Sequence, residues 1–396
     1  MSNSFETIVV GLGAMGSCAL AELARRGVRA LGIDRFDPPH DRGSSHGGSR
    51  VIRLSYFEHP DYVPLLRRSY ECFDRMSHDA GTTLRFETGL LVGGAAGNTA
   101  AAGMLRSAQL HDLEVTALDG AEVMRRFPQF AMPRDGDAVF ERRGGFVRPE
   151  ATIAAALEAA ARDGARIERS SPVLSWGSDA SGAWVETARG RFEASSLVLC
   201  GGAWMREILG ADAPALQPTR ETMVWIDDES DPAWQVGTHS NRMPVWLFDR
   251  GSEPAVYGIP RWPGMGSPTG LKVGLHGRGP AIELDSSGGS VDAVIDSEVV
   301  AQTLATVAHW LPSARARRVD AARHCLYTMS ADSEFVLGLH PHLPRVAVAC
   351  GFSGHGFKFA PVIGEVLADL AVSGNTALPI AFLAPTRQGA GWMGRG

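Results

Sequence analysis

The chain lacks the features that mark membrane-spanning, secreted or nucleic-acid-binding proteins. No segment approaches the roughly 18 consecutive apolar residues of a membrane span, and residues 1–10 contain no basic stretch followed by a long apolar one. The formal net charge is −6, whereas a nucleic-acid partner requires clustered cations, which do not dominate here. We therefore expect neither secretion, membrane insertion nor nucleic-acid binding.

Short motifs for metal binding, hydrolysis and disulfide chemistry are also missing. The 12 histidines include no H-E-x-x-H spacing, so we expect no metal site. The letters G-x-S-x-G occur once, as GSSHG at 43–47, but the polar run RFDPPHDR at 35–42 precedes them in place of an apolar strand. The strand–turn–helix elbow of a hydrolase triad is therefore missing. The five cysteines contain no C-x-x-C pair, and their odd number leaves at least one unpaired, so a reducing cytoplasm is the expected compartment.

Length and composition are those of a globular enzyme. With 396 residues, 44% hydrophobic and 21% charged, the chain can bury a large core and is long enough for two domains. Strand and helix patterns alternate at both ends and become rich in strands in the middle, without an internal repeat. This order predicts an α/β layer next to a mainly antiparallel sheet.

Residues 7–34 carry the most informative motif. An apolar run at 8–10 precedes GLGAMG at 11–16, a helical segment follows, and a second apolar strand ends at Asp34. In such a βαβ unit Gly11 permits the tight turn, Gly13 lets the backbone approach a pyrophosphate, and Gly16 lets helix and strand pack closely. Asp34 would accept hydrogen bonds from a ribose diol. The motif predicts a dinucleotide site and by itself leaves FAD and NAD(P) open.

A second glycine-rich turn lies far along the chain. Three glycines within 351–356 separate a buried strand at 345–349 from a helix expected at 358–372. Two such cradles suit a long ligand such as FAD, whose isoalloxazine needs its own anchoring site, and the helix would direct its positive end at that ligand. The alternative is an ordinary strand–loop–helix turn, and spacing alone does not separate the two.

Three separated blocks carry a more specific signal. They are GSSHGGSRVIR at 43–53, HCLYT at 324–328 and GFSGHGFKF at 351–359. Together with the N-terminal motif they resemble the monomeric sarcosine oxidase and N-methyltryptophan oxidase family of FAD-dependent amine oxidases, and the similarity runs along nearly the whole chain. The resemblance implies oxidation of a small-molecule amine with O2 as the electron acceptor.

The same resemblance implies the architecture. We expect an α/β + β fold: a Rossmann-type FAD-binding domain with a second, mainly antiparallel-sheet substrate domain, as in glutathione reductase and D-amino-acid oxidase. The expected FAD-binding domain combines residues 1–80, 145–215 and 320–396, and the expected substrate domain combines 81–144 and 216–319. The quaternary state expected is a monomer or a small homo-oligomer.

Cys325 is the residue through which the resemblance implies a covalent FAD, as an 8α-S-cysteinyl link. Taken alone, a free cysteine is more often a small buried hydrophobe. The surrounding HCLYT block favours the flavin link instead. A thioether there would fix the ring and raise its oxidising power.

The resemblance suggests chemical roles for several cationic residues. An amino-acid substrate brings a carboxylate into a site that excludes water, and burial of that charge is costly unless it is paired. The resemblance implies that Arg53 and Lys358 bind this carboxylate. Lys272 would lie near flavin N5 and promote reaction with oxygen, because a fixed cation stabilises superoxide. Taken alone, Lys272 also fits an edge-strand lysine.

Further residues are expected around the cofactor and the substrate by the same match. Those expected to take part in catalysis are Arg50, Lys272, His276 and Tyr257, of which Tyr257 would also contact the substrate. Those expected to bind the cofactor are Gly11, Gly13, Ala14, Met15, Gly16, Asp34, Arg35, Ser44, His46, Ser49, Arg50, Val173, Gly201, Cys325, Gly354, His355, Gly356, Phe357 and Lys358.

Departures from the family pattern bear on the substrate. The run at 261–269 looks longer than the corresponding sarcosine oxidase turn, and Gly48 and Ser49 replace an acidic residue and a threonine. A secondary or tertiary amine of an amino acid is therefore the expected substrate, with a side chain that can exceed that of glycine. Two alternatives remain: the same fold acting on a cyclic imino acid, a fructosyl amino acid or a biosynthetic intermediate, and a non-catalytic redox sensor.

Overall fold

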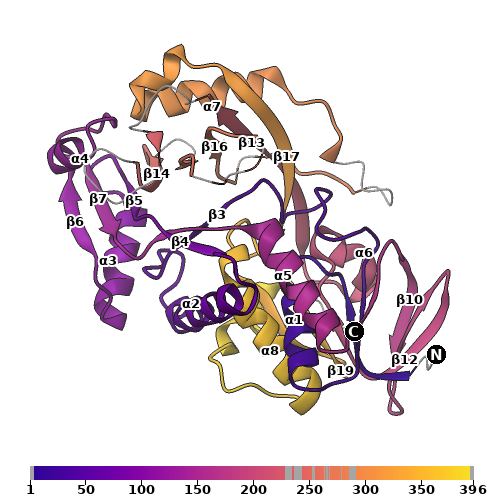
Figure 1. The fold of residues 1–396 in the computed structure, drawn as a ribbon. Coiled ribbons are helices and arrows are strands. Elements are labelled where there is room, and N and C mark those ends of the chain that lie inside the picture. The colour runs from indigo at the N-terminus through magenta and orange to yellow at the C-terminus, as the bar shows by residue number, and fades with distance from the viewer. Residues whose placement is uncertain are drawn as a thin grey trace.

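Two large sheets lie in separate halves of the molecule, and a small sheet lies where the halves meet (Figure 1). The computed structural model describes residues 4–227, 234–235, 243–251, 255–262, 264, 266, 268–277, 279–284 and 291–392. Part of the run at 261–269, namely residues 263, 265 and 267, lies outside them. No helix in the described ranges has both the length and the apolar composition needed to cross a bilayer.

The first sheet contains the N-terminal βαβ unit and has the order β10-β11-β12-β1-β2-β9, with β19 also beside β12 and β18 beside β19. Pairing is parallel between β1 and its neighbours β2 and β12, and antiparallel at the β10–β11 edge. The strands are β1 (Ser4–Val10), β2 (Ala30–Ile33), β9 (Arg166–Glu168), β10 (Val173–Ser178), β11 (Ala183–Thr187), β12 (Gly190–Leu199), β18 (Val336–His340) and β19 (Leu343–Cys350).

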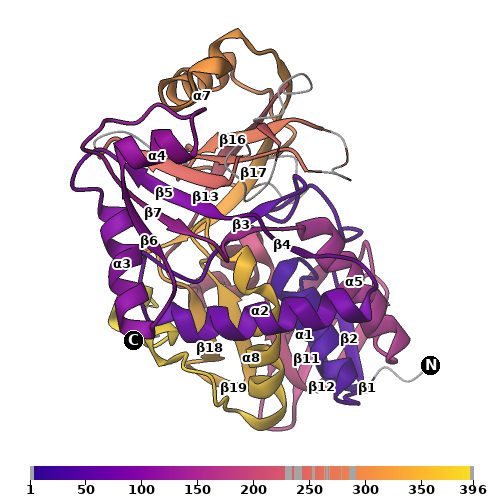
Figure 2. The same cartoon turned by 60° about the vertical axis from the view of Figure 1, so that its left-hand side comes forward.

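Alternate side chains of these strands face opposite layers, as the pleat requires. Val9 packs in one core with helices α1 (Ala14–Arg25), α5 (Pro149–Arg162) and α8 (Ala360–Ser373), while Ile8 packs in another core with β11 and α6 (Met205–Leu209). Figure 2 shows α2 (Tyr62–Asp79) crossing the helical layer, where it contacts α8. Because both faces are covered, ligand access is left at the carboxyl ends of the strands.

The second sheet has the order β17-β13-β16-β15-β14-β5-β7-β6 and is antiparallel except between β14 and β5. Helix α7 (Ser297–Trp310) contacts β13, β15 and β16. The strands are β5 (Leu90–Gly94), β6 (Thr116–Asp119), β7 (Asp137–Glu141), β13 (Leu216–Ile226), β14 (Val245–Asp249), β15 (Val256–Ile259), β16 (Leu271–Leu275) and β17 (Val319–Ser330).

The third sheet and several short helices complete the described fold. The third sheet has the order β3-β8-β4. Its strands are β3 (Arg50–Ile52), β4 (Arg85–Glu87) and β8 (Gly145–Val147). The remaining helices are α3 (Thr99–His111), α4 (Gly120–Arg126) and the 3₁₀ turns η1 (Gly202–Trp204), η2 (Gly210–Asp212), η5 (Pro312–Ala316), η6 (Phe357–Phe359), η7 (Ala381–Leu383) and η8 (Gln388–Ala390).

The predicted fold class is confirmed: an α/β layer with a Rossmann-type unit stands beside a mainly antiparallel sheet. The strand and helix pattern of the sequence also predicts one extended segment at 83–92, with Gly89 near its end, and a helix at 292–310, and the structure differs from both. The extended segment expected at 83–92 is divided between two sheets, because Gly89 takes a left-handed φ of 76° that redirects the chain. The helix expected at 292–310 begins at Ser297, where the Asp296 carboxylate accepts a 2.8 Å hydrogen bond from the Glu298 amide.

The expected division into domains follows the two large sheets only in part. All of β17 except Val319 falls within the segment assigned to the FAD-binding domain, yet the strand pairs along its length with β13 of the second sheet. The long β13–β17 pair therefore belongs to both expected domains, and the exact division stays a prediction.

Candidate functional site

A cavity of about 540 Å³ extends from the glycine loop of the first sheet to the second sheet. Gly11 and Ile33 line it at the carboxyl ends of β1 and β2, and Leu247 and Tyr257 line it from β14 and β15. This is the position at which open α/β sheets bind ligands. The site is therefore shared between the two large sheets.

The first glycine cradle fits a pyrophosphate. A Cβ on Gly11, at φ 87°, would lie 2.5 Å from the Cys200 carbonyl oxygen, and a Cβ on Gly16 would lie 1.8 Å from the Gly11 carbonyl oxygen. A Cβ on Gly13 would meet nothing within 4 Å, and Gly13 lines the cavity. On the side away from the cavity, the turn therefore packs too tightly for any side chain at Gly11 or Gly16. On the cavity side, at the N-terminus of α1, Gly13 leaves room for an anion.

Asp34 lines the same cavity and also holds this loop. One of its carboxylate oxygens accepts a 2.6 Å hydrogen bond from the Leu12 amide, and the other accepts a 2.8 Å bond from the Phe36 amide. The carboxylate is 6% exposed. Contact with a ribose diol stays a prediction, and any such bond would be added to the two backbone bonds.

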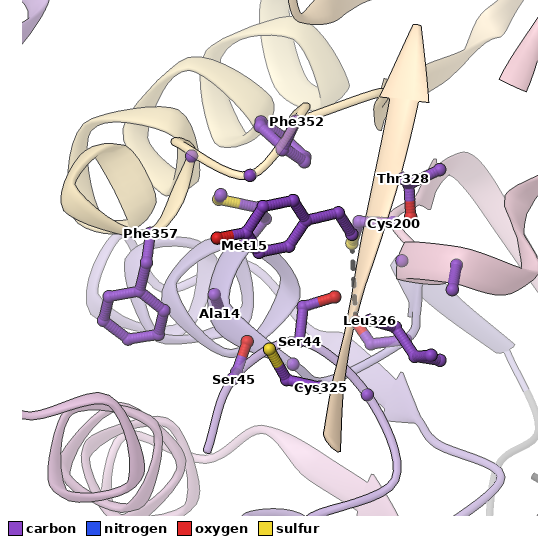
Figure 3. A pocket seen from close by; sticks show the side chains of 18 of the residues that line it. Ala14, Met15, Ser44, Ser45, Cys200, Cys325, Leu326, Thr328, Phe352 and Phe357 are labelled. Atoms are coloured by element: carbon purple, nitrogen blue, oxygen red, sulfur yellow. Dashed lines mark hydrogen bonds between the residues drawn. The ribbon is translucent and has the colours of Figure 1, made fainter. Parts of the chain in front are cut away.

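The second cradle lines the same cavity, and Figure 3 shows its Phe352 and Phe357 around the same space as Cys325 and as Ala14 and Met15 of the first turn. Gly354 takes a φ of 80°, and a Cβ there would lie 2.2 Å from a ring carbon of Tyr327. The chain from Gly354 to Lys358 lines the cavity. Both glycine-rich turns therefore contribute to one long site, as a ligand of the length of FAD requires.

Strand register brings several predicted residues to one face of the second sheet. Tyr257 pairs with Gly274, and Ile259 pairs with Lys272. Paired residues of an antiparallel ladder point to the same face. Gly274 leaves room for the Tyr257 side chain, whose hydroxyl would be 2.7 Å from a Cβ at position 274. The cavity wall from β14 to β16 therefore carries a tyrosine and a lysine side by side.

Lys272 is almost completely buried, with 1% exposure. Its ammonium donates hydrogen bonds to the carbonyl oxygens of Gly47 at 3.0 Å and Ser49 at 2.8 Å. Burial and the Arg50 guanidinium hold the pKa of Lys272 well below its usual range, against the opposite influence of Cys325 and Glu150. Arg50 itself donates to the carbonyl oxygens of Ser49 and Ser44, each at 2.8 Å.

Cys325 lies 3% exposed on β17 and lines the cavity. Burial raises the pKa of its thiol, while the nearby Arg50 and Lys272 act in the opposite direction. Figure 3 shows Cys325 near Ser44 and Ser45, and the Leu326 amide donates to the Gly43 carbonyl oxygen at 3.3 Å. The thiol thus lies in the same cavity as both cations, where they favour its thiolate form.

Arg53 and Lys358 also line the cavity, each 4% exposed. The Arg53 guanidinium donates to the Glu58 carboxylate and lies 4.0 Å from the Phe57 ring centroid. The Lys358 ammonium donates to the His355 carbonyl oxygen at 2.7 Å. Both cations lie over the Tyr56 ring, at 4.4 Å for Arg53 and 5.2 Å for Lys358.

These two cations are electrostatically coupled. Burial and the Arg53 charge lower the pKa of Lys358 to about 7, although Glu58 opposes that shift. Burial by itself would raise the pKa of Glu58, but the neighbouring Arg53 guanidinium outweighs burial, and the pKa of Glu58 is lowered to about 2. Lys272 and Lys358 are the only two lysines in the sequence, and both are buried in this cavity.

His276 is the remaining expected catalytic residue, and it also lines the cavity. Its Nδ1 lies 3.3 Å from the Tyr327 hydroxyl. Burial is the main cause that lowers the pKa of His276 to about 4, so the ring is neutral at physiological pH. Burial likewise raises the pKa of Tyr257.

All the residues expected around cofactor and substrate lie within the described ranges, and all but two line the cavity. Gly16 lies behind the loop, where a Cβ would strike Gly11, as its packing role requires. His46 also lies behind the lining, 4% exposed, and neither ring nitrogen has a partner among the described residues. Burial is the main cause that lowers the pKa of His46 to about 3.

Three acidic residues belong to the site and were not predicted. Glu58 pairs with Arg53. Glu141, on β7, accepts hydrogen bonds from the Leu54 amide at 2.7 Å and the Ser55 amide at 2.8 Å. Glu150 accepts from two further loop amides. None of the three has a local sequence signal, because an acid in a loop, at the end of a strand or at the start of a helix is common. Glu141 and Glu150 bind loops that are distant in sequence, and Glu58 binds Arg53 five residues before it.

Comparison with known proteins agrees with this geometry. A model of the FAD dependent oxidoreductase family (DAO) matches residues 6–370. Monomeric sarcosine oxidase of Streptomyces avermitilis is 38% identical over 389 residues, which cover 98% of this chain and 98% of that protein. N-methyl-L-tryptophan oxidase of Salmonella arizonae is 32% identical over 370 residues, covering 93% of this chain and 95% of that protein.

Solved structures extend the likeness of fold. NikD, described as an unusual amino acid oxidase essential for nikkomycin biosynthesis, aligns with a TM-score of 0.81 at 24% identity over 97% of this chain and 98% of that one. L-proline dehydrogenase from P. horikoshii aligns with the same TM-score of 0.81 at 19% identity, again over 97% and 98%. The expected family is confirmed: the chain belongs to the FAD dependent oxidoreductase family, with monomeric sarcosine oxidase and N-methyl-L-tryptophan oxidase among its relatives, and is an FAD-dependent amine oxidase.

Proposed function

We propose that the enzyme oxidises the secondary or tertiary amine of an α-amino acid, with N-methyl amino acids as the main class. The amine, counted from its N-protonated form, loses two electrons and two protons and becomes an iminium ion, which for a secondary amine is the protonated imine, while O2 gains both and becomes hydrogen peroxide. Water then hydrolyses the imine, releasing formaldehyde where an N-methyl group was oxidised. Bound FAD supplies the electron transfer between the two.

The observation that carries the proposal is the buried pair of cations, Arg53 and Lys358, in one cavity. Each is 4% exposed, and a charge that deep is stable only beside an opposite charge. Glu58 supplies one carboxylate for the Arg53–Lys358 pair. A second anion is therefore expected, and the carboxylate of an amino acid would complete the set.

Glu58 also sets a condition for binding. Its carboxylate already takes up a donor of Arg53, and its pKa of about 2 keeps it ionised. A substrate carboxylate would therefore share Arg53 with Glu58 or displace it. The stacking of the guanidinium on Phe57 and Tyr56 would keep Arg53 in position during this exchange.

Neutral side chains surround the rest of the proposed substrate site. His276 is uncharged above a pH of about 4, so its ring can accept a hydrogen bond from an amine without repelling it. Leu90, Val92, Leu247 and Ile259 add an apolar wall from β5, β14 and β15. This wall supports a substrate with an apolar side chain, because a sugar or a second carboxylate would lose hydration there without gaining partners.

A substrate panel tests the proposal. Holoenzyme is incubated with N-methyl amino acids of increasing side-chain size, with a cyclic imino acid, with a fructosyl amino acid and with the parent primary amines, and hydrogen peroxide and formaldehyde are measured. We expect peroxide from N-methyl amino acids with matching formaldehyde, and at least tenfold lower kcat/KM for the primary amines. Turnover confined to fructosyl or cyclic substrates would replace the proposed class, and no turnover of any N-methyl amino acid by the flavin-loaded enzyme would refute it.

Covalent attachment of FAD at Cys325 is the second part of the proposal. The thiol sulfur would bond to the flavin 8α-methyl carbon, and the two electrons and protons released would pass through the flavin to O2. We expect wild-type protein to be heavier than its apoprotein by one FAD less two hydrogens, and its yellow colour to stay with the acid-precipitated pellet. Cys325→Ser should release all of its flavin to the supernatant.

Cys200→Ser is the matched control, because Cys200 is also a buried thiol lining the cavity. It should keep the covalent flavin. If the wild-type flavin is released by acid, or a peptide map finds unmodified Cys325 in holoenzyme, the link at Cys325 is wrong.

A further inference from the structure

Residues 47–49 form a loop between an anion and a cation. On one side, the Glu150 carboxylate accepts hydrogen bonds from the Gly47 amide at 2.6 Å and from the Gly48 amide at 3.1 Å. On the other side, the carbonyl oxygens of Gly47 and Ser49 accept from the Lys272 ammonium at 3.0 and 2.8 Å. The loop therefore joins Glu150 to Lys272 through consecutive peptide groups.

The backbone conformation of the loop makes this two-sided contact possible. Gly47 has a φ of 90° and Gly48 a φ of 78°, a region that residues with a Cβ rarely adopt. In this turn the N–H groups of Gly47 and Gly48 both donate to the Glu150 carboxylate, as successive N–H groups do in an anion-binding backbone turn. Space is also limited, since a Cβ on Gly47 would lie 2.9 Å from the Met223 side chain.

Glu150 is well placed to hold the loop still. It is the second residue of α5, which packs against α1 in the core of the first sheet, so its backbone is fixed by the helical layer. Hydrogen bonds in series strengthen one another, because a carboxylate that polarises a peptide N–H also makes the carbonyl of the chain a better acceptor. Lys272 itself is bonded to neutral carbonyl oxygens.

The charges around Lys272 show how Glu150 affects its protonation. The groups that act on its ammonium are Arg50, Cys325 and Glu150; burial and Arg50 oppose the charged form, whereas Cys325 and Glu150 favour it. If Cys325 is bound to flavin, its thiol no longer supplies a negative charge. Glu150 then remains the acidic group that supports the Lys272 cation.

We propose that Glu150 is a positioning residue that holds loop 47–49 and thereby fixes the Lys272 ammonium beside the flavin for the reaction with O2. The proposal rests on the proposed role of Lys272 and deepens it. Glu150 does not line the cavity, so it acts on the reaction through the loop and through its charge near Lys272, without touching substrate or flavin.

The test uses the holoenzyme with Glu150→Gln, and Glu158→Gln as the matched control, because Glu158 is an exposed acid on the same helix. The two half-reactions are measured by stopped flow. We expect Glu150→Gln to slow reoxidation by O2 about tenfold, which is less than the roughly 100- to 1,000-fold effect of removing a preorganised electrostatic group itself, because Lys272 is still present. Anaerobic reduction by substrate should change less than twofold, and Glu158→Gln should leave both rates unchanged.

A second readout does not depend on turnover. Because the chain has only two lysines, labelling with ¹³C,¹⁵N-lysine gives two side-chain signals, assigned with Lys272→Met and Lys358→Met. In Glu150→Gln the Lys272 signal should shift and titrate at lower pH, since a nearby negative charge has been removed. The Lys358 signal serves as an internal control and should stay in place.

Two further variants separate the possible failures. In a Lys272→Met background, Glu150→Gln should slow reoxidation no further, because the two act as a unit. If Lys272→Met does not slow reoxidation, the role of Lys272 fails while the NMR result still tests the link to Glu150. Should Glu150→Gln not retain flavin, Glu150→Asp keeps the charge and shortens the reach; it should shift the Lys272 signal and slow reoxidation less than Lys272→Met. An unchanged Lys272 signal with unchanged reoxidation in the folded variant overturns the proposal.

Discussion

Replacing Lys272 by methionine is expected to slow reoxidation of the reduced enzyme by O2 about 100-fold or more, while anaerobic reduction by substrate falls much less. Reduction of O2 begins with the formation of a superoxide-like anion, and a fixed ammonium in a water-poor cavity lowers the energy of that anion. Withdrawal of electrons from the amine produces no such anion. Lys272 is 1% exposed and already held by two carbonyl oxygens, so its charge is preorganised. Stopped-flow measurement of both half-reactions checks the result.

The pH dependence gives a second check on Lys272. Burial and Arg50 lower its pKa, so the ammonium form is present at low pH and is lost as the pH rises through that lowered pKa. The rate constant for reoxidation should therefore fall with rising pH in the parent enzyme and lose this dependence in Lys272→Met. Equal slowing of both half-reactions would mean that Lys272 mainly shapes the cavity, and unchanged reoxidation would transfer the role to Arg50.

Removing Arg53 or Lys358 is expected to cost about 2–4 kcal/mol in kcat/KM for carboxylated substrates, or roughly 30- to 1,000-fold, mostly as weaker binding. Each side chain is buried, so the loss leaves a substrate carboxylate without a strong partner. Arg53→Met also deprives Glu58 of its partner, and the double variant Arg53→Met/Glu58→Gln separates the two effects. Steady-state kinetics and ligand titrations give the values.

Controls for the carboxylate site come from the substrate, the surface and the pH. The amide of the same amino acid should be affected less than tenfold, and Arg29→Met, on the exposed surface, should change nothing. Methoxyacetate has no ionisable amine, so its Kd reports the site alone. With the pKa of Lys358 at about 7, its charge is present below that pH and is lost above it, so the Kd should rise above pH 7 in the parent and not in Lys358→Met. If neither replacement changes kcat/KM for carboxylated substrates, the assignment of Arg53 and Lys358 to the carboxylate is wrong.

Features that depend on residues contiguous in the chain could be predicted from the sequence. Gly11, Gly13 and Gly16 identify a dinucleotide loop, because the tight turn, the open approach and the helix packing are all satisfied within one strand–turn–helix segment. The fold class and the family followed from this loop and the three longer blocks, and both the fold class and the family are confirmed. Element boundaries were less secure: the break at Gly89 and the helix start at Ser297 depend on single backbone conformations.

The pairing of charged side chains with their partners depends on the tertiary structure. Lys272 and Ile259 share a face because of the register of β15 and β16, and no local pattern encodes that register. Glu58, Glu141 and Glu150 read as ordinary acids along the chain; only folding brings their carboxylates to loop amides or to a buried guanidinium. Residue types that carry chemistry could thus be predicted from their blocks. The partners of these residues could not be predicted from the sequence. The charge of each group depends on burial and on long-range contacts, and these arise only when the two sheets come together around one cavity.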